Sequence, residues 1–134
     1  GFMISDNGGA SASWMNYYEW WSSETALQDY DVVLRITLPD DFKSWQTNAI
    51  VVDYQTENAL TTENSLSAKV YLQSSGTELA TIAATASLSW ATATIASTPL
   101  NTLTAGETIV IVLRLSSMND QYARVGDVSL NYNK

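Results

Sequence analysis

Apolar and polar residues alternate along most of this chain, which is the pattern of β-strands that bury only one face. The clearest example is "DVVLRITL", from Asp31 to Leu38. Every second residue from Val32 onward is aliphatic and would face a core, while Val33, Arg35 and Thr37 would face outward. No stretch shows convincing helical spacing, so the pattern predicts an all-β chain.

The same alternation predicts about eight strands, separated by turn-rich segments such as "QSSGTE" and "SSMNDQ". The predicted strands are Trp14–Ser22, Asp31–Leu38, Ala49–Thr56, Leu66–Gln73, Glu78–Ala84, Ala91–Ala96, Thr108–Ser116 and Tyr122–Tyr132. Short antiparallel strands at this spacing favour a two-sheet β-sandwich of the jelly-roll type. A chain of 134 residues without an internal linker is expected to form a single domain, residues 1–134.

The charge and composition of the chain limit the kinds of molecule that it is expected to bind. The formal net charge is −8, and only six Lys and Arg residues are scattered along the chain. Nucleic-acid binding needs clustered cations, so we expect none. Apolar runs such as "TIVIVL" are too short to span a bilayer, which argues against membrane insertion. An acidic β chain rich in Ser and Thr is frequent among secreted and cell- or virus-surface proteins, so we expect an extracellular location.

Most enzyme chemistry is excluded by the residues that the chain lacks. It has no His and no Cys, which rules out Ser-His-Asp and Cys-His nucleophilic sites and His-ligated zinc. Paired carboxylates for glycoside hydrolysis are available, yet most of them fall on predicted loops, where acids are hydrated. We therefore predict that the chain is not an enzyme, with a small paired-acid hydrolase as the least favoured alternative.

No cofactor is predicted except a structural calcium, which takes six to eight oxygen ligands. The segments "SDNGG" (Ser5–Gly9) and "MNDQ" (Met118–Gln121) are rich in oxygen atoms but short. Asp6, Asp120 and Asp127 are the candidate ligands. The favoured interpretation is that these segments form simple Asx turns, with a structural calcium as the alternative.

The aromatic stretch "NYYEWW" (Asn16–Trp21) raises the main functional question. In a strand, Tyr17, Glu19 and Trp21 would share one face, and two further aromatic side chains would share the other. Three interpretations stay open for the first face: packing within the fold, contact with a neighbouring subunit or domain, or a glycan-binding surface. Rings that stack on sugars would then be Tyr17 and Trp21, with Trp45 joining from the rim of a loop.

For the packing interpretation, Trp14, Tyr18 and Trp20 would belong to the core and Trp21 would cover the edge of the sandwich. If the strands that carry the outward-facing Arg35 and Arg114 are neighbours, both residues would form a charged ladder with Glu19 or Asp53 on a solvent-exposed face.

The strand Ala91–Ala96 carries no charge and no proline, so it is a candidate edge for accepting a strand from a neighbour.

Segments in the last third, "LTAGETIVIVLRLSS" and "YARVGDVSLNY", resemble the closing strands of galactose-binding-like jelly rolls, a fold that includes many carbohydrate-binding modules. Together with "YYEW" and "LQDYDVVLRITLPDDFKSW", they also resemble β-sandwich domains of bacterial and phage surface and fibre proteins. In the carbohydrate-binding modules an acid in the closing strand often helps to hold a structural calcium. Asp127 matches that position, and Glu19 would stand for the usual N-terminal glutamate.

The preferred hypothesis from the sequence is a non-catalytic structural or adhesive domain of an extracellular surface or fibre-type assembly. Its partners would be other subunits or domains of that assembly. The alternative is a carbohydrate-binding module that uses exposed Trp and Tyr rings.

Overall fold

The computed structural model describes residues 1–6 and 14–134, and these form nine β-strands and one short 3₁₀ turn. The elements are β1 (Phe2–Asp6), β2 (Met15–Trp21), β3 (Gln28–Thr37), β4 (Ser44–Thr56), β5 (Asn64–Leu72), β6 (Thr77–Thr85), β7 (Ala91–Ala96), η1 (Thr98–Leu100), β8 (Thr108–Ser117) and β9 (Tyr122–Asn133).

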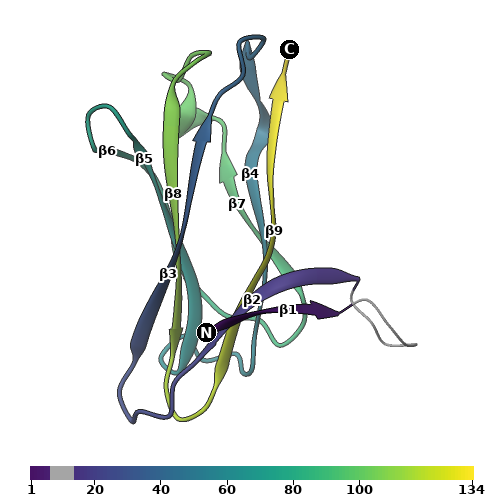
Figure 1. Cartoon of the computed structure of the whole chain (residues 1–134), viewed down its shortest axis with the longest axis vertical. Helices are drawn as coiled ribbons and strands as arrows, with labels where there is room; N and C mark the ends of the chain where they lie inside the picture. The colour runs from purple at the N-terminus through teal and green to yellow at the C-terminus, as the bar shows by residue number, and fades with distance from the viewer. Residues whose placement is uncertain (7–13) are drawn as a thin grey trace.

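The strands form two antiparallel sheets that pack face to face (Figure 1). One sheet has five strands in the order β1-β2-β9-β4-β7, and the other has four in the order β3-β8-β5-β6. Strands far apart in the sequence, such as β2 and β9, are therefore direct neighbours. The predicted two-sheet antiparallel sandwich is confirmed.

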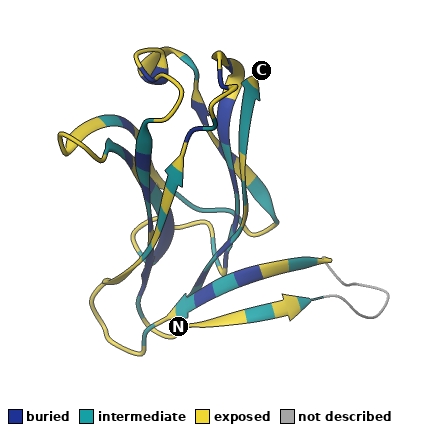
Figure 2. Cartoon of the chain, turned by 45° about the horizontal axis from the view of Figure 1, so that its top comes forward, coloured by how far each residue is buried: buried dark blue, intermediate teal, exposed yellow. Residues whose placement is uncertain are grey.

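The core lies between the sheets, and the alternation in the sequence explains why. In β8, Ile109, Ile111, Leu113 and Leu115 are at most 1 % exposed, while the residues between them face outward. The register places Leu34 of β3 and Val70 of β5 on either side of Ile111, so aliphatic residues form continuous rows across the inner face. Figure 2 shows buried positions as dark bands along strands of both sheets.

All eight predicted strands are present, with shifted boundaries, and a ninth strand was missed. Among the described strands, β1 pairs only with β2, at the edge of its sheet. Strand β4 begins at Ser44 and not at the predicted Ala49, and its register with β9 shifts between Trp45 and Ile50. An irregularity of this kind interrupts the period of two, so the sequence pattern cannot reveal the first part of the strand.

Strand β7 lies at the edge of the five-stranded sheet, and the N-terminal strand β1 lies at the opposite edge. The described termini therefore do not cover β7, and strand addition at that edge stays a prediction.

Candidate functional site

The outer face of the five-stranded sheet carries a cluster of aromatic and charged side chains on the neighbouring strands β2 and β9. The register pairs Glu19 with Arg124 and Trp21 with Tyr122. Since residues directly opposite each other in antiparallel strands point to the same side, these four side chains share the outward face with Tyr17. We call this set (Tyr17, Glu19, Trp21, Tyr122 and Arg124) the β2–β9 face.

Arg124 lies at the centre of the β2–β9 face and is held by four neighbours. Its Nε donates to Glu19 Oε1 at 2.7 Å, and an Nη1 hydrogen donates to Gln55 Oε1 at 3.0 Å. The guanidinium carbon lies 3.8 Å from the centre of the Tyr122 ring and 4.8 Å from that of Tyr17. Cation–π contacts and a charge-assisted hydrogen bond together fix the guanidinium group in one position.

A surface hollow lies over this arrangement, lined by Glu19, Trp21, Asp120, Tyr122 and Arg124. Trp21 is 47 % exposed, so much of its indole is open to solvent. The backbone of Tyr122 is fixed as well, because its N–H donates to Glu57 Oε2 at 3.1 Å. An open indole beside a phenol ring, with carboxylate, guanidinium and amide groups around them, can stack on an apolar ring face and hydrogen-bond to hydroxyl groups.

Tyr17 is on the expected face but is buried. Only 7 % of it is exposed, and its ring centre lies 5.4 Å from that of Trp90. Burial raises the pKa of the Tyr17 phenol. Within the β2–β9 face, Tyr17 therefore supports Arg124 from below and offers no open ring.

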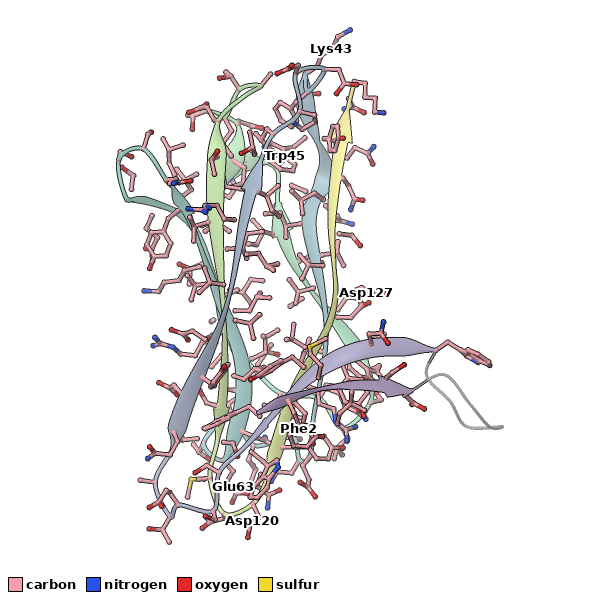
Figure 3. The ribbon with its side chains drawn as sticks, viewed as in Figure 1. Phe2, Lys43, Trp45, Glu63, Asp120 and Asp127 are labelled. Carbon is pink, nitrogen blue, oxygen red and sulfur yellow. The ribbon has the colours of Figure 1, made fainter. Side chains whose placement is uncertain are left out.

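Trp45 does not join this face, and the expectation that it lies on an exposed loop rim is wrong. It belongs to β4, pairs with Tyr132 of β9 and is 7 % exposed. Its ring packs edge-on against Phe42 at 5.1 Å, and no described residue accepts a hydrogen bond from its Nε1. Figure 3 shows Trp45 near the end of the sandwich opposite Asp120.

The other face of β2 packs inward, as the sequence predicted for Tyr18 and Trp20. Both rings stack on Tyr30 of β3 at 5.2 Å, and the Trp20 Nε1–H donates to the carbonyl of Gln28 at 2.9 Å. A hydrogen bond with Tyr30 raises the pKa of Tyr18 to about 12. Trp14, by contrast, is 74 % exposed, so its predicted place in the core is wrong.

The predicted ion pairs of Arg35 and Arg114 with Glu19 or Asp53 are also wrong. Arg114 donates to both carboxylate oxygens of Asp31, at 2.9 and 3.0 Å. It belongs to the four-stranded sheet, whereas Glu19 and Asp53 belong to the other one. Glu19 is paired with Arg124 instead.

The three candidate calcium ligands are not brought into one site. Asp120 lies at the turn before β9 and Asp127 lies well along that strand (Figure 3). Among the described residues, no group of three or more His, Cys, Asp or Glu side chains is placed to hold a metal ion. Asn7–Gly9 of the "SDNGG" segment lie outside the described residues, and a structural calcium stays a prediction.

Sequence reasoning missed Gln55, Tyr122 and Arg124. The alternation in "YARV" already places Tyr122 and Arg124 on one side of a strand and Ala123 on the other. The sequence could not predict which strand lies beside β9, because the β2–β9 pairing joins residues about a hundred positions apart.

The strand order and the two packed antiparallel sheets define an all-β sandwich of the jelly-roll type, which confirms the predicted fold. No protein-family model matches the chain, and no curated protein is similar to it in sequence. A similar solved structure is the carbohydrate-binding module TmCBM61 in complex with β-1,4-galactotriose. The two structures align with a TM-score of 0.63 and 13 % sequence identity, over 98 % of this chain and 81 % of that one.

The described part of the chain contains no helix that is long and apolar enough to cross a bilayer.

Proposed function

We propose that this chain is a non-catalytic carbohydrate-binding module and that it binds its glycan at the β2–β9 face. The observation that carries the proposal is the pairing of Trp21 with Tyr122 across neighbouring strands, over a hollow lined by polar side chains. Aromatic rings stack on the C–H faces of sugars, while fixed polar groups select the orientation of the hydroxyls.

The fixed position of Arg124 supports binding. Its hydrogen bonds to Glu19 and Gln55 are already made in the unliganded chain, so little side-chain freedom remains to be lost when a ligand arrives. A preorganised surface of this kind suits recognition of a weakly binding, uncharged hydroxyl-rich ligand.

The non-catalytic part of the proposal rests on the same geometry. A retaining or inverting glycosidase needs one carboxyl group as a general acid and a second as a nucleophile or base. Glu19 is only 8 % exposed and its carboxylate is bonded to Arg124, which leaves it poorly placed for either role.

The first test is binding of purified chain to β-1,4-galactotriose and to a broad glycan panel, measured by calorimetry. We expect Trp21→Ala to bind its glycan more weakly by up to about tenfold, since ring stacking contributes up to about 1.5 kcal/mol. Trp14→Ala is the matched control, because it removes an even more exposed tryptophan outside the hollow and should bind as the unmodified chain does.

Absence of binding to every glycan in the panel would contradict the proposal. Equal losses in Trp21→Ala and Trp14→Ala would contradict the assignment of the site. Tyr122→Ala provides a second test from the other strand, and its effect should resemble that of Trp21→Ala.

A glycan ligand fits an extracellular or surface location, which we propose together with the binding function. The structural or adhesive role in a surface or fibre-type assembly stays a prediction, since the comparisons offer no support for it.

A further inference from the structure

The outer face of the four-stranded sheet differs in charge from the rest of the molecule. It carries three of the six cations, Arg35, Lys69 and Arg114, together with three acids. The acids are Asp29, Asp31 and Glu78, and they pair with Arg114 and Lys69. This face is therefore formally neutral, and the whole net charge of −8 belongs to the rest of the chain.

Strand β3 is an edge of this sheet, bonded along its full length to β8 on one side. Its centre is Val33, which is 57 % exposed although it is aliphatic. In the described part of the chain, Arg35 forms no ion pair, so one cation beside Val33 is not compensated within the molecule.

The sequence of β3 is complementary to itself when reversed about Val33. Asp31 and Arg35 lie two residues to either side of it and point to the outer face with it. Val32 and Leu34 are its immediate neighbours and point to the core face. If a second copy of β3 were aligned antiparallel on Val33, each Asp31 would lie opposite an Arg35 of the other copy. Each Val32 would likewise lie opposite a Leu34.

We infer that two copies of this chain associate edge to edge through antiparallel β3 strands, with Val33 opposite Val33 at a two-fold axis. Asp31 of each copy then lies opposite Arg35 of the other on the outer face. The unpaired backbone N–H and C=O groups of the two edges bond to each other, and the two four-stranded sheets become one continuous sheet of eight strands.

Three observations favour this partner and this register. Copies that each carry a charge of −8 repel, so contact is favoured at the face where charge is balanced. The two hydrogen bonds from Arg114 hold the Asp31 carboxylate on the outer face. They also lower the pKa of Asp31, so its carboxylate is negatively charged and attracts a second cation. The exposed Val33 would be covered at the axis.

Two of the other described edges, β6 and β7, specify a partner less well. Strand β6 meets β5 with two register shifts, which twist an edge away from regular pairing. Strand β7 has no charged residue that would fix one register against another.

The test is the oligomeric state of the intact chain, measured by analytical ultracentrifugation from about 1 to about 500 μM. We expect a concentration-dependent dimer for the unmodified chain. Arg35→Glu should be monomeric over the same range, because like charges then face each other twice. Val33→Lys should also be monomeric, and since Val33 is exposed this change leaves the core intact.

Lys43→Glu is the matched control, because it makes the same change in net charge at an exposed lysine on the loop before β4 and should dimerise normally. A chain that stays monomeric at every concentration would overturn the inference. So would dimers that persist in Arg35→Glu and Val33→Lys, or that disappear only in Thr94→Lys, which would place the contact at β7. The β2–β9 face is on the other sheet, so glycan binding can succeed or fail independently of these results.

Discussion

Arg124 shows how much one side chain organises on this surface. It joins β2 through Glu19 and β4 through Gln55, and it lies between two tyrosine rings. Three strands are thus connected through a single guanidinium group, which ties the shape of the candidate glycan site to the stability of the sheet.

The Glu19–Arg124 pair should therefore matter more to stability than an exposed pair of the same type. The side chains of Glu19 and Arg124 are 11 and 21 % exposed, against 46 and 54 % for Glu78 and Lys69. We expect Glu19→Gln to lower the free energy of unfolding by about 1.5–3 kcal/mol. Glu78→Gln should lower it by less than about 1 kcal/mol. Urea unfolding of the two variants measures both values, and equal losses would contradict the expectation.

Asp53 gives a prediction about pH. Burial and the nearby Asp127 carboxylate raise the pKa of Asp53. Since its folded pKa lies above the unfolded value, the ionised form destabilises the folded state at neutral pH, and this cost disappears as pH falls through the folded pKa. Asp53→Asn should thus be more stable than the unmodified chain at about pH 7, with the difference shrinking toward about pH 3.

Urea midpoints at the two pH values test this expectation. Asp127→Asn is the companion variant, because it removes only the repulsive neighbour and should give a smaller gain. A loss of stability in Asp53→Asn at neutral pH would show that its carboxylate is favourable where it lies.

At the scale of elements, close packing between β2, β9 and the segment before β7 shapes the site. A Cβ atom at Gly126 of β9 would overlap the Met15 thioether and come within 3.2 Å of the Trp90 ring. Trp90 in turn packs on Tyr17 beneath Arg124. The absence of a side chain at Gly126 therefore lets β2 and Trp90 approach β9.

We expect Gly126→Ala to destabilise the fold by about 1–3 kcal/mol, the usual cost of overpacking. Ser129→Ala on the same strand is exposed and should change stability by no more than about 0.5 kcal/mol. Thermal unfolding of both variants provides the measurement. A Gly126→Ala variant as stable as Ser129→Ala would mean that Met15 moves aside without cost.

Elements with strict alternation were the ones that the sequence could predict. Residues such as Ile111 and Leu113 repeat every second position, so their inward direction followed from the pattern alone. Trp45 was misplaced because the register shift after it hides the first part of β4. The partners of Arg114 and Glu19 could not be derived, since they depend on which strands lie in the same sheet.

At the scale of the whole molecule, net charge should govern the response to salt. Six cations oppose fourteen acids, so self-repulsion acts on the compact state. Raising NaCl from about 0.01 M to about 1 M shortens the Debye length from about 30 Å to about 3 Å. We expect the melting temperature at neutral pH to rise over this range.

The same titration near pH 4 is the control, because protonation of carboxyl groups then removes most of the repulsion and the rise should be smaller. A melting temperature that falls with salt at neutral pH would indicate that the exposed ion pairs outweigh the repulsion.

The distribution of lysine side chains has a practical consequence for measuring binding. The three lysines are Lys43, Lys69 and Lys134. Lys69 lies on the four-stranded sheet, and Lys43 lies at the end of the sandwich opposite Asp120 (Figure 3). Lys134 is the C-terminal residue and pairs with Asp41. The β2–β9 face contains an arginine and no lysine, so coupling to a sensor chip or bead through a lysine side chain would attach the chain at another surface and leave this face accessible to a ligand.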